Sequence, residues 1–268
     1  MWWSRRHNFV DEALHPLLGG DVWAAACALR GEVVRSAPGR RTLRFEHGGQ
    51  TYYIKQHFGA GWGELLKNWL TGKHPVLSAV NELRAARRLQ NAGVAAIRVR
   101  AFWREGVSPA HQRSLIVSEA LPEAVQLDHL LQSWGWKFPS PQVRAALIDA
   151  VGALAGGMFD AGVAHRDCYA CHFMVSKAWA DHPAGRPELF LLDLHRAYCG
   201  VEVPRRLMVR DLAQLLFSLG ELELSLCDRV RFARALCGTA WRSRRRDVLR
   251  QWGAITARAQ ALHRRHRS

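Results

Sequence analysis

The chain has 268 residues, of which 49% are hydrophobic and 23% are charged, and its formal net charge is +15. This composition is that of an ordinary globular protein with one large core or two small lobes, and the positive charge favours an anionic partner such as nucleic acid, a phosphorylated glycolipid or an anionic membrane surface. No stretch approaches the roughly 20 uninterrupted apolar residues of a membrane span, so we expect a soluble or peripheral protein.

The beginning of the chain has no pattern of an export signal. Residues 1–6 are aromatic and basic, and they lead to Asp11 and Glu12 and not to an apolar segment with a cleavage site. We therefore expect a cytoplasmic protein whose six cysteines are reduced.

The first third of the chain predicts a small antiparallel sheet behind an N-terminal cap. We assign residues 1–30 to the cap, with a helix over 22–29. Turn-rich segments separate three β-prone runs, and the third run alternates so that Tyr53 and Lys55 share one face. The runs are 32–35, 42–46 and 51–56, and the turns are 36–39 and 47–49.

A helix and two further strands complete this predicted lobe. Ser78 is the expected N-cap of a helix over 79–91 that Gly93 ends. Glu82 shares a face of this helix with apolar residues, and a lone carboxylate there needs a cation. Strands over 97–103 and 114–118 follow, and then an extended linker, 119–122, places the lobe boundary near Pro122.

The second half of the chain is mainly helical. A helix begins at Pro141, carries apolar residues at helical spacing up to Met158, and is followed by Gly162 as a stop. An apolar run over 189–192 predicts a buried strand that places Asp193 at its end. We also expect a helix over 211–219 and a helical or frayed arginine-rich tail over 241–268.

The stretch between these helices carries the most specific motif. It begins with His165-Arg166-Asp167, the triplet of a kinase catalytic loop, with His172 five residues after the Asp, where kinases usually have Asn. Cys168-Tyr169-Ala170-Cys171-His172 also fits C-x-x-C-H, the attachment pattern of c-type haem. Haem attachment normally follows export, so the lack of an export signal favours the kinase interpretation.

Four elements stand in the order of a kinase: Lys55 on a strand, Glu82 on a helix, Asp167 in the triplet and Asp193 at a strand end. Phosphoryl transfer depends on positioning and charge stabilisation. In this scheme Lys55, oriented by Glu82, holds the nucleotide phosphates of ATP. Asp193 binds Mg²⁺, and Asp167 deprotonates the acceptor hydroxyl.

At these residues the chain resembles the lipopolysaccharide core kinases, which phosphorylate heptose or Kdo sugars of the Gram-negative inner core, and among them the heptose I kinases most. This family has His in place of the kinase Asn and Asp-Leu-His in place of Asp-Phe-Gly. The similar stretches lie between about residues 33 and 219. They are Tyr53-Ile54-Lys55 near Gly61-Trp62-Gly63-Glu64, residues 165–173, Leu191-Leu192-Asp193-Leu194-His195-Arg196-Ala197 and Arg210-Asp211-Leu212-Ala213.

The resemblance implies roles for further residues. His165 and Arg166 accompany the base Asp167, and Asp211 braces the catalytic loop at the start of its helix. His172 takes the second metal-ligand position, or it hydrogen-bonds Asp167 or a phosphate, because Mg²⁺ prefers oxygen donors. No G-x-G-x-x-G loop covers the phosphates, so Arg40 and Arg41 are assigned to them, and Glu119 in the linker completes the nucleotide-binding residues.

These inferences predict an α+β, two-lobed, protein-kinase-like fold. Its parts are an N-terminal cap (1–30), a β-rich N-lobe (31–121) and a helical C-lobe with a basic tail (122–268). The predicted function is ATP- and Mg²⁺-dependent phosphorylation of a heptose in the lipopolysaccharide inner core, at the cytoplasmic face of the inner membrane. Alternative acceptors are Kdo, the second heptose and protein tyrosine. Alternatives of another class are a non-catalytic binding module and a haem protein. We expect no nucleic-acid partner, because no nucleic-acid-binding motif is present.

Overall fold

The computed structural model describes residues 8–37, 39–59, 79–106, 112–121, 123–220 and 222–267. Several predictions lie outside these residues: the N-cap at Ser78, the lobe boundary at Pro122 and the similarity over 61–64. The described chain forms two compact units, one of Met1–Ala86 with Ile97–Ala120, the other of Arg87–Ala96 with Leu121–Ser268. None of the helices in the described ranges combines the length and apolar character that a membrane span requires.

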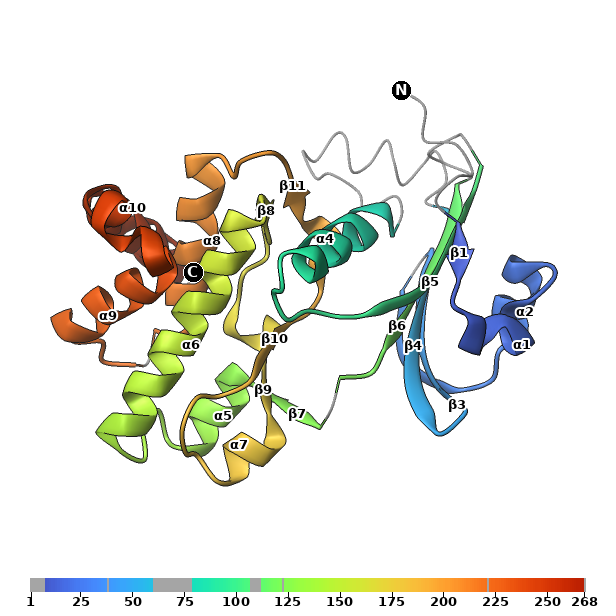
Figure 1. Ribbon diagram of the computed structural model, residues 1–268, viewed down its shortest axis with the longest axis horizontal. Coiled ribbons are helices and arrows are strands. Elements are labelled where there is room, and N and C mark those ends of the chain that lie inside the picture. The colour runs from blue at the N-terminus through green and yellow to red at the C-terminus, as the bar shows by residue number, and fades with distance from the viewer. Residues whose placement is uncertain are drawn as a thin grey trace. The chain divides into compact units, whose positions relative to one another are not determined.

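The first unit is built on a six-stranded antiparallel sheet in the order β1-β5-β6-β4-β3-β2 (Figure 1). Alternation along β4 buries Tyr52, Ile54 and Gln56 and leaves Tyr53 and Lys55 on the opposite face, as predicted. The strands are β1 (Phe9–Val10), β2 (Glu32–Ala37), β3 (Arg40–His47), β4 (Gln50–His57), β5 (Val99–Glu105) and β6 (Arg113–Glu119).

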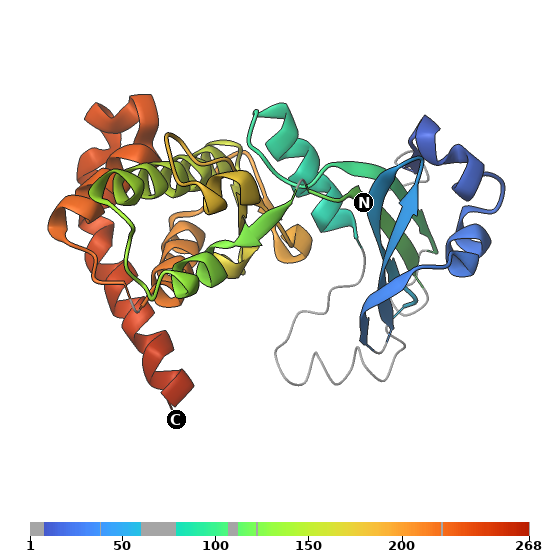
Figure 2. The same ribbon diagram turned by 90° about the horizontal axis from the view of Figure 1, so that it is seen from below.

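Helices cover both faces of this sheet (Figure 2). On one face, η2 (Glu12–Leu14), α1 (His15–Leu18) and α2 (Val22–Ala28) bury Leu14, Leu18 and Ala26 against the strands. On the other face, α4 (Val80–Asn91) buries Leu83 beside Phe102. The predicted helix over 22–29 is confirmed by α2, and Gly93, at φ 69°, ends α4 as expected. The segment before β2 thus forms part of the core of this unit.

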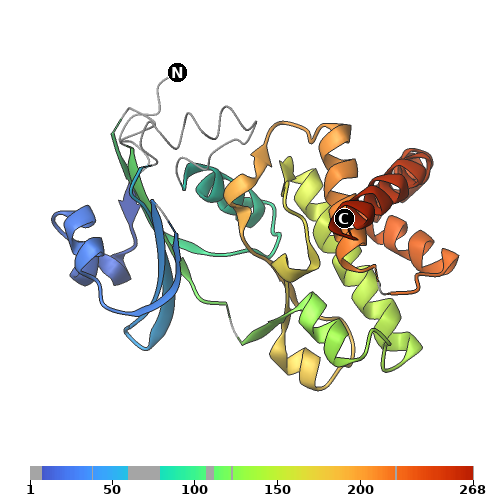
Figure 3. The same ribbon diagram turned by 180° about the vertical axis from the view of Figure 1, so that it is seen from behind.

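The second unit is mainly helical, and its four long helices α6, α8, α9 and α10 pack side by side (Figure 3). Two glycines of α6 allow the backbone of α9 to approach, because a Cβ at Gly152 would lie 2.9 Å from the carbonyl oxygen of Phe232. The helices are α5 (Leu127–Ser133), α6 (Pro141–Asp160), α7 (Lys177–Asp181), α8 (Arg205–Ser218), α9 (Leu226–Cys237) and α10 (Trp241–Arg267).

Short strands and turns of this unit carry the catalytic motif. The strands β7 (Ala124–Gln126), β9 (Phe173–Ser176) and β10 (Leu189–Leu191) form one small sheet, and β8 (Val163–Ala164) pairs with β11 (Tyr198–Cys199). Two 3-10 turns, η3 (Ala170–His172) and η4 (Leu194–Arg196), follow the Asp167 and Asp193 positions. The predicted strand end at Asp193 is confirmed.

One helix boundary was predicted wrongly. Asp211 was expected at the start of its helix, but α8 begins six residues earlier, at Arg205, directly after Pro204. The first turn is exposed at Arg205 and Arg206 and the next residues, Leu207–Arg210, are only half-buried, so the buried face of the helix begins at Asp211. Asp211 therefore lies inside the helix, where it is fully buried. The tail, by contrast, is a packed helix, because α10 buries Val248 and Ile255.

Candidate active site

The catalytic loop runs between β8 and η3, and α8 binds its main chain. The carboxylate of Asp211 accepts hydrogen bonds from the main-chain N–H groups of His165 (2.7 Å) and Arg166 (2.9 Å). Burial raises the pKa of Asp211 to about 7, and these two N–H groups act in the opposite direction. The bracing contact implied by the resemblance is thus present, although Asp211 makes it from within the helix.

Two residues of this region have left-handed backbone conformations, which are uncommon for residues other than Gly. Arg166 has φ 65°, and Asp193 has φ 59° and ψ 51°. Such conformations are concentrated at functional sites, where the surrounding contacts hold them in place. They set the directions in which the chain presents Asp167 and Asp193.

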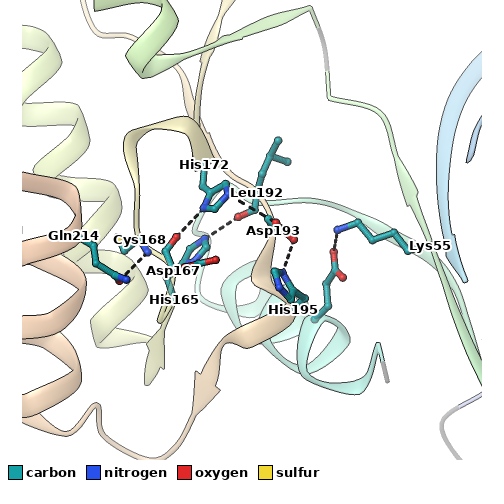
Figure 4. Close-up of polar contacts among 10 residues, drawn as sticks. Lys55, His165, Asp167, Cys168, His172, Leu192, Asp193, His195 and Gln214 are labelled. Carbon is teal, nitrogen blue, oxygen red and sulfur yellow. Dashed lines mark hydrogen bonds and ion pairs between the residues drawn. The ribbon is translucent and has the colours of Figure 1, made fainter. Parts of the chain in front are cut away.

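His172 links the two acidic residues (Figure 4). Its Nδ1 lies 2.7 Å from the main-chain oxygen of Asp167. A carbonyl only accepts, so Nδ1 carries the proton, and Nε2 faces the Oδ2 atom of Asp193 at 3.8 Å. This distance is too long for a direct hydrogen bond. Of the three alternatives given for His172, the hydrogen bond to Asp167 is therefore present, and it is made to the main chain.

His165 is a neutral buried residue. Its Nε2 donates to the main-chain oxygen of Leu192 (2.8 Å), and its ring stacks on that of His172 with centroids 5.2 Å apart. Burial is the main reason that the pKa of His165 is lowered to about 4. An uncharged, fully buried imidazole suits a structural support of the loop better than a proton-transfer group.

Asp193 offers oxygen donors for a metal ion. One oxygen, Oδ1, accepts from Nδ1 of His195 at 2.6 Å, which orients the carboxylate. No group of three or more His, Cys, Asp and Glu side chains suited to a metal ion occurs in the described ranges. Mg²⁺ nevertheless fits this chemistry, because it is commonly bound by one or two carboxylates, with phosphates and water as the remaining ligands.

In the first unit, Lys55 and Glu82 form an ion pair. The Nζ atom of Lys55 lies 2.7 Å from Oε1 of Glu82, and the side chain of Glu82 is 1% exposed. β4 and α4 bring the two residues together across 27 positions of sequence. The predicted pairing of the helix carboxylate with a strand cation is present in the structure.

The other nucleotide-binding candidates lie on the same sheet. Arg40 and Arg41 belong to β3 and not to a covering loop, and Nε of Arg41 donates to Gln56 (3.0 Å). The carboxylate of Glu119, at the end of β6, pairs with Arg100 at 2.7 Å. The side chain of Glu119 is therefore engaged within the sheet, and its main-chain N–H donates to the carbonyl oxygen of Arg98 (2.9 Å).

Positive charge gathers beside the catalytic loop. Burial and the neighbouring guanidinium groups of Arg210 and Arg196 lower the pKa of Arg166. The antiparallel pairing of β11 with β8 places Tyr198 opposite Ala164. Because Arg196 comes two residues before Tyr198 and Arg166 two residues after Ala164, the same register brings the two arginines close together. Such a concentration of guanidinium groups favours an anionic substrate.

The two cysteines of the C-x-x-C-H pattern are free thiols. Cys168 is completely buried, and burial raises its pKa well above the usual value. A thioether bond to a haem therefore cannot form at Cys168 in this fold. Sequence reasoning missed two other residues, Gln214 and Ser218, which contact the loop from α8.

A model of the lipopolysaccharide kinase (Kdo/WaaP) family matches residues 24–236. The chain belongs to this family. The lipopolysaccharide core heptose(I) kinase WaaP of Pseudomonas aeruginosa is 42% identical over 241 residues, 89% of this chain and 87% of that protein. The enzyme of the same name from Escherichia coli K12 is 36% identical over 223 residues, 82% of this chain and 83% of that protein.

A solved structure of WaaP in complex with acyl carrier protein has the same fold. It is 35% identical, with a TM-score of 0.78, and the match covers 95% of this chain and 98% of that one. The predicted kinase-like α+β fold and the predicted phosphotransferase class are thus confirmed for this lipopolysaccharide kinase. The non-catalytic and haem interpretations are not supported.

Proposed function

We propose that this lipopolysaccharide kinase transfers the γ-phosphoryl group of ATP to a hydroxyl of the first heptose of the inner core. The observation that carries the proposal is the placement of Asp167 and Asp193 on either side of His172, in a chain 42% identical to a heptose(I) kinase. The gathering of Arg166, Arg196 and Arg210 beside the loop supports an anionic glycolipid as the acceptor.

In the proposed reaction the acceptor oxygen attacks the γ-phosphorus, the bond from that phosphorus to the β,γ-bridging oxygen breaks, and ADP leaves. The proton of the hydroxyl passes to the carboxylate of Asp167. The contribution of Arg166 and His165 is to hold the loop around that carboxylate. Lys55, oriented by the buried carboxylate of Glu82, binds the phosphates of the nucleotide.

Asp193, and His172 through Nε2, would hold Mg²⁺. The ion supplies neutralisation of the phosphate charge when it is bound. His195 keeps Asp193 oriented through its 2.6 Å hydrogen bond. Arg40, Arg41 and Glu119 remain predicted nucleotide contacts, and the exposed position of Arg40 on β3 supports the contact of that residue.

We also propose an acyl carrier protein as a partner and the cytoplasmic face of the inner membrane as the place of action. The first proposal follows from the complex formed by the related WaaP. The second is supported by the outer face of α10, where exposed arginines suit anionic lipid headgroups, each contributing about 1 kcal/mol. These arginines are Arg242, Arg245, Arg246, Arg250, Arg258, Arg264 and Arg265.

The test is transfer of labelled γ-phosphate from ATP with Mg²⁺ to lipopolysaccharide that lacks core phosphate, with the Asp167→Ala variant as control. Label on the first heptose that is lost in the variant is the expected result. Label on Kdo, on the second heptose or on tyrosine would replace the acceptor assignment, and transfer by the folded variant at the wild-type rate would contradict the role of Asp167. Co-purification of acyl carrier protein from the native host tests the proposed partner.

A further inference from the structure

A row of hydrogen-bonding side chains on α8 follows the catalytic loop residue by residue. Asp211, Gln214 and Ser218 are spaced i, i+3 and i+7, so they share one face of the helix. Each accepts hydrogen bonds from main-chain N–H groups of the loop. The bonds run from His165 to Asp211 Oδ2 (2.7 Å), Arg166 to Asp211 Oδ1 (2.9 Å), Cys168 to Gln214 Oε1 (3.2 Å) and Ala170 to Ser218 Oγ (2.9 Å).

The loop depends on these partners because it has little regular structure of its own. Between Ala164, the end of β8, and Ala170, the start of η3, the loop contains no helix or strand whose main-chain carbonyls could accept from its N–H groups. The N–H of Cys168 is deeply buried, and a buried N–H without a partner is strongly disfavoured. The acceptors on α8 therefore determine the path of the main chain.

The amide of Gln214 has one orientation that satisfies both of its ends. Oε1 faces the N–H of Cys168, and Nε2 donates to the hydroxyl of Tyr169 (3.2 Å). The side chain is only 5% exposed, so water does not compete for these bonds. Ser218 is equally defined, because its hydroxyl donates to the carbonyl of Leu215 (2.8 Å) and its oxygen is left to accept from Ala170.

Asp167 lies between the bonded positions. The residue before it, Arg166, and the residue after it, Cys168, are each tied to α8, and its own carbonyl accepts from His172. The peptide group after Asp167 is thereby held at both its carbonyl and its N–H, and the peptide group between His165 and Arg166 is held by Asp211. The direction of its carboxylate follows from that frame.

A stack of aromatic rings supports the same arrangement from the C-terminal helix. The ring of Tyr169 meets that of Phe217 edge-on, with centroids 6.2 Å apart. Phe217 in turn packs against His263 (4.6 Å) and His266 (5.0 Å) of α10. The end of α10 thus backs the tyrosine whose hydroxyl orients Gln214.

We propose that Gln214 and Ser218 are positioning residues for Asp167, acting through the main chain of the catalytic loop and not on the substrate. This inference rests on the proposed function, in which Asp167 is the base. Asp211 holds the N–H groups of His165 and Arg166 before Asp167, and Gln214 and Ser218 hold those of Cys168 and Ala170 after it. The three side chains together hold the main chain of the loop on both sides of Asp167.

The experiment compares Gln214→Met, which keeps the size of the side chain and removes the acceptor, with Ser218→Ala. Gln251→Met on α10 is the matched control. Gln251 is also a buried glutamine, 8% exposed, and in the described part of the chain it makes no hydrogen bond to the catalytic loop. The measurements are kcat and KM for ATP and lipopolysaccharide, the melting temperature, and hydrogen–deuterium exchange of the loop amides.

We expect Gln214→Met to lower kcat roughly 10- to 100-fold, the range that small misplacements of catalytic groups produce, with KM for ATP within about twofold. Exchange at Cys168 should accelerate in this variant, and exchange at Ala170 should accelerate in Ser218→Ala. Gln251→Met should keep the wild-type kcat, and Ser218→Thr, which retains the hydroxyl, should restore most of the activity of Ser218→Ala.

A double-mutant test separates positioning from general stability. In an Asp167→Ala background, Gln214→Met should cause no further loss of the residual rate, because the effect of Gln214 passes through Asp167. Unchanged kcat in folded Gln214→Met and Ser218→Ala, or additive losses with Asp167→Ala, would overturn the inference. If Gln214→Met does not fold, Ser218→Ala, which removes one oxygen atom, decides alone.

Failure of the wild type to phosphorylate lipopolysaccharide would instead count against the proposed function. The hydrogen–deuterium exchange data would still show whether Gln214 and Ser218 hold the main chain of the loop.

Discussion

The Nδ1–H of His172 donates to the main-chain carbonyl of Asp167 over 2.7 Å, and this contact determines that Nε2 of the same ring faces Asp193. One imidazole thus has two separable tasks. Nδ1 holds the frame of the proposed base, and Nε2 points at the proposed metal ligand. Most kinases have Asn at this position, and Asn presents only one side-chain donor near the place of Nδ1.

Asparagine and glutamine at position 172 should separate the two tasks. The amide nitrogen of Asn lies near the position of Nδ1, and that of Gln lies near the position of Nε2. His172→Asn should therefore keep kcat within about tenfold of the wild type at saturating Mg²⁺, whereas His172→Gln should lose about 10- to 100-fold. Steady-state kinetics over a range of Mg²⁺ concentrations tests this. Equal losses in both variants would show that Nδ1 has no special role.

The buried Glu82 makes the Lys55 pair sensitive to the removal of one partner. Lys55→Met leaves a carboxylate that is 1% exposed without this cation, and we expect a loss of roughly 3 kcal/mol in the free energy of unfolding. The double variant Lys55→Met/Glu82→Gln should recover part of that loss, because no buried charge is left unpaired. Urea denaturation measures both. A double variant less stable than Lys55→Met would contradict this account.

Patterns that act within one element were enough to predict part of the site. Alternation along β4 placed Lys55 on the face opposite the buried Tyr52 and Ile54. Helical periodicity identified Glu82 as a carboxylate on an apolar face, and a short apolar run predicted that Asp193 ends a strand. These features depend only on the period of a strand or helix, so a single sequence reveals them.

Contacts between distant elements were not predictable in this way. Gln214 and Ser218 bind main-chain groups 46 and 48 positions earlier, and no local period reports such a contact. One signal was present: Asp211, Gln214 and Ser218 form a polar row beside the apolar row of the same helix. The predicted start of α8 lay six residues too far along the chain, at Asp211. An acidic residue is common at the start of a helix, so Asp211 did not draw attention to the polar row.

Acid should weaken the junction of α6 and α9 at a defined pH. Arg144 binds both carboxylate oxygens of Asp228 (2.7 and 3.0 Å), and this contact is the main reason that the pKa of Asp228 is lowered to about 2. The pKa is lower in the folded state than in the unfolded chain, so the stabilisation is complete above about pH 4 and is lost as the pH falls toward about 2. We expect this pair to contribute about 1–2 kcal/mol to the free energy of unfolding, which denaturation at a series of pH values between 5 and 2 measures.

The control for this pH dependence is a similar pair on the same two helices. Arg231 and Asp149 lie 2.8 Å apart, but their side chains are 47% and 49% exposed, so solvent screens their attraction. Arg144→Met should flatten the acid limb of the stability curve, whereas Arg231→Met should leave it as in the wild type. An unchanged acid limb in Arg144→Met would remove Asp228 as its cause.

Gly220 tests whether the end of α10 supports the catalytic loop. A Cβ at this position would lie 2.6 Å from Nε2 of His263, so Gly220→Ala must displace the ring that packs on Phe217. We expect a loss of about 1–2 kcal/mol in stability, typical of overpacking, together with a several-fold lower kcat.

Gly253→Ala is the matched control, because Gly253 lies within α10, is exposed and has nothing within 4 Å of its Cβ position. That variant should be about 0.5–1 kcal/mol more stable, with the wild-type kcat. If Gly220→Ala melts at a lower temperature but keeps the full kcat, α10 stabilises the unit without supporting the loop, and the aromatic stack ends at Phe217 as far as catalysis is concerned.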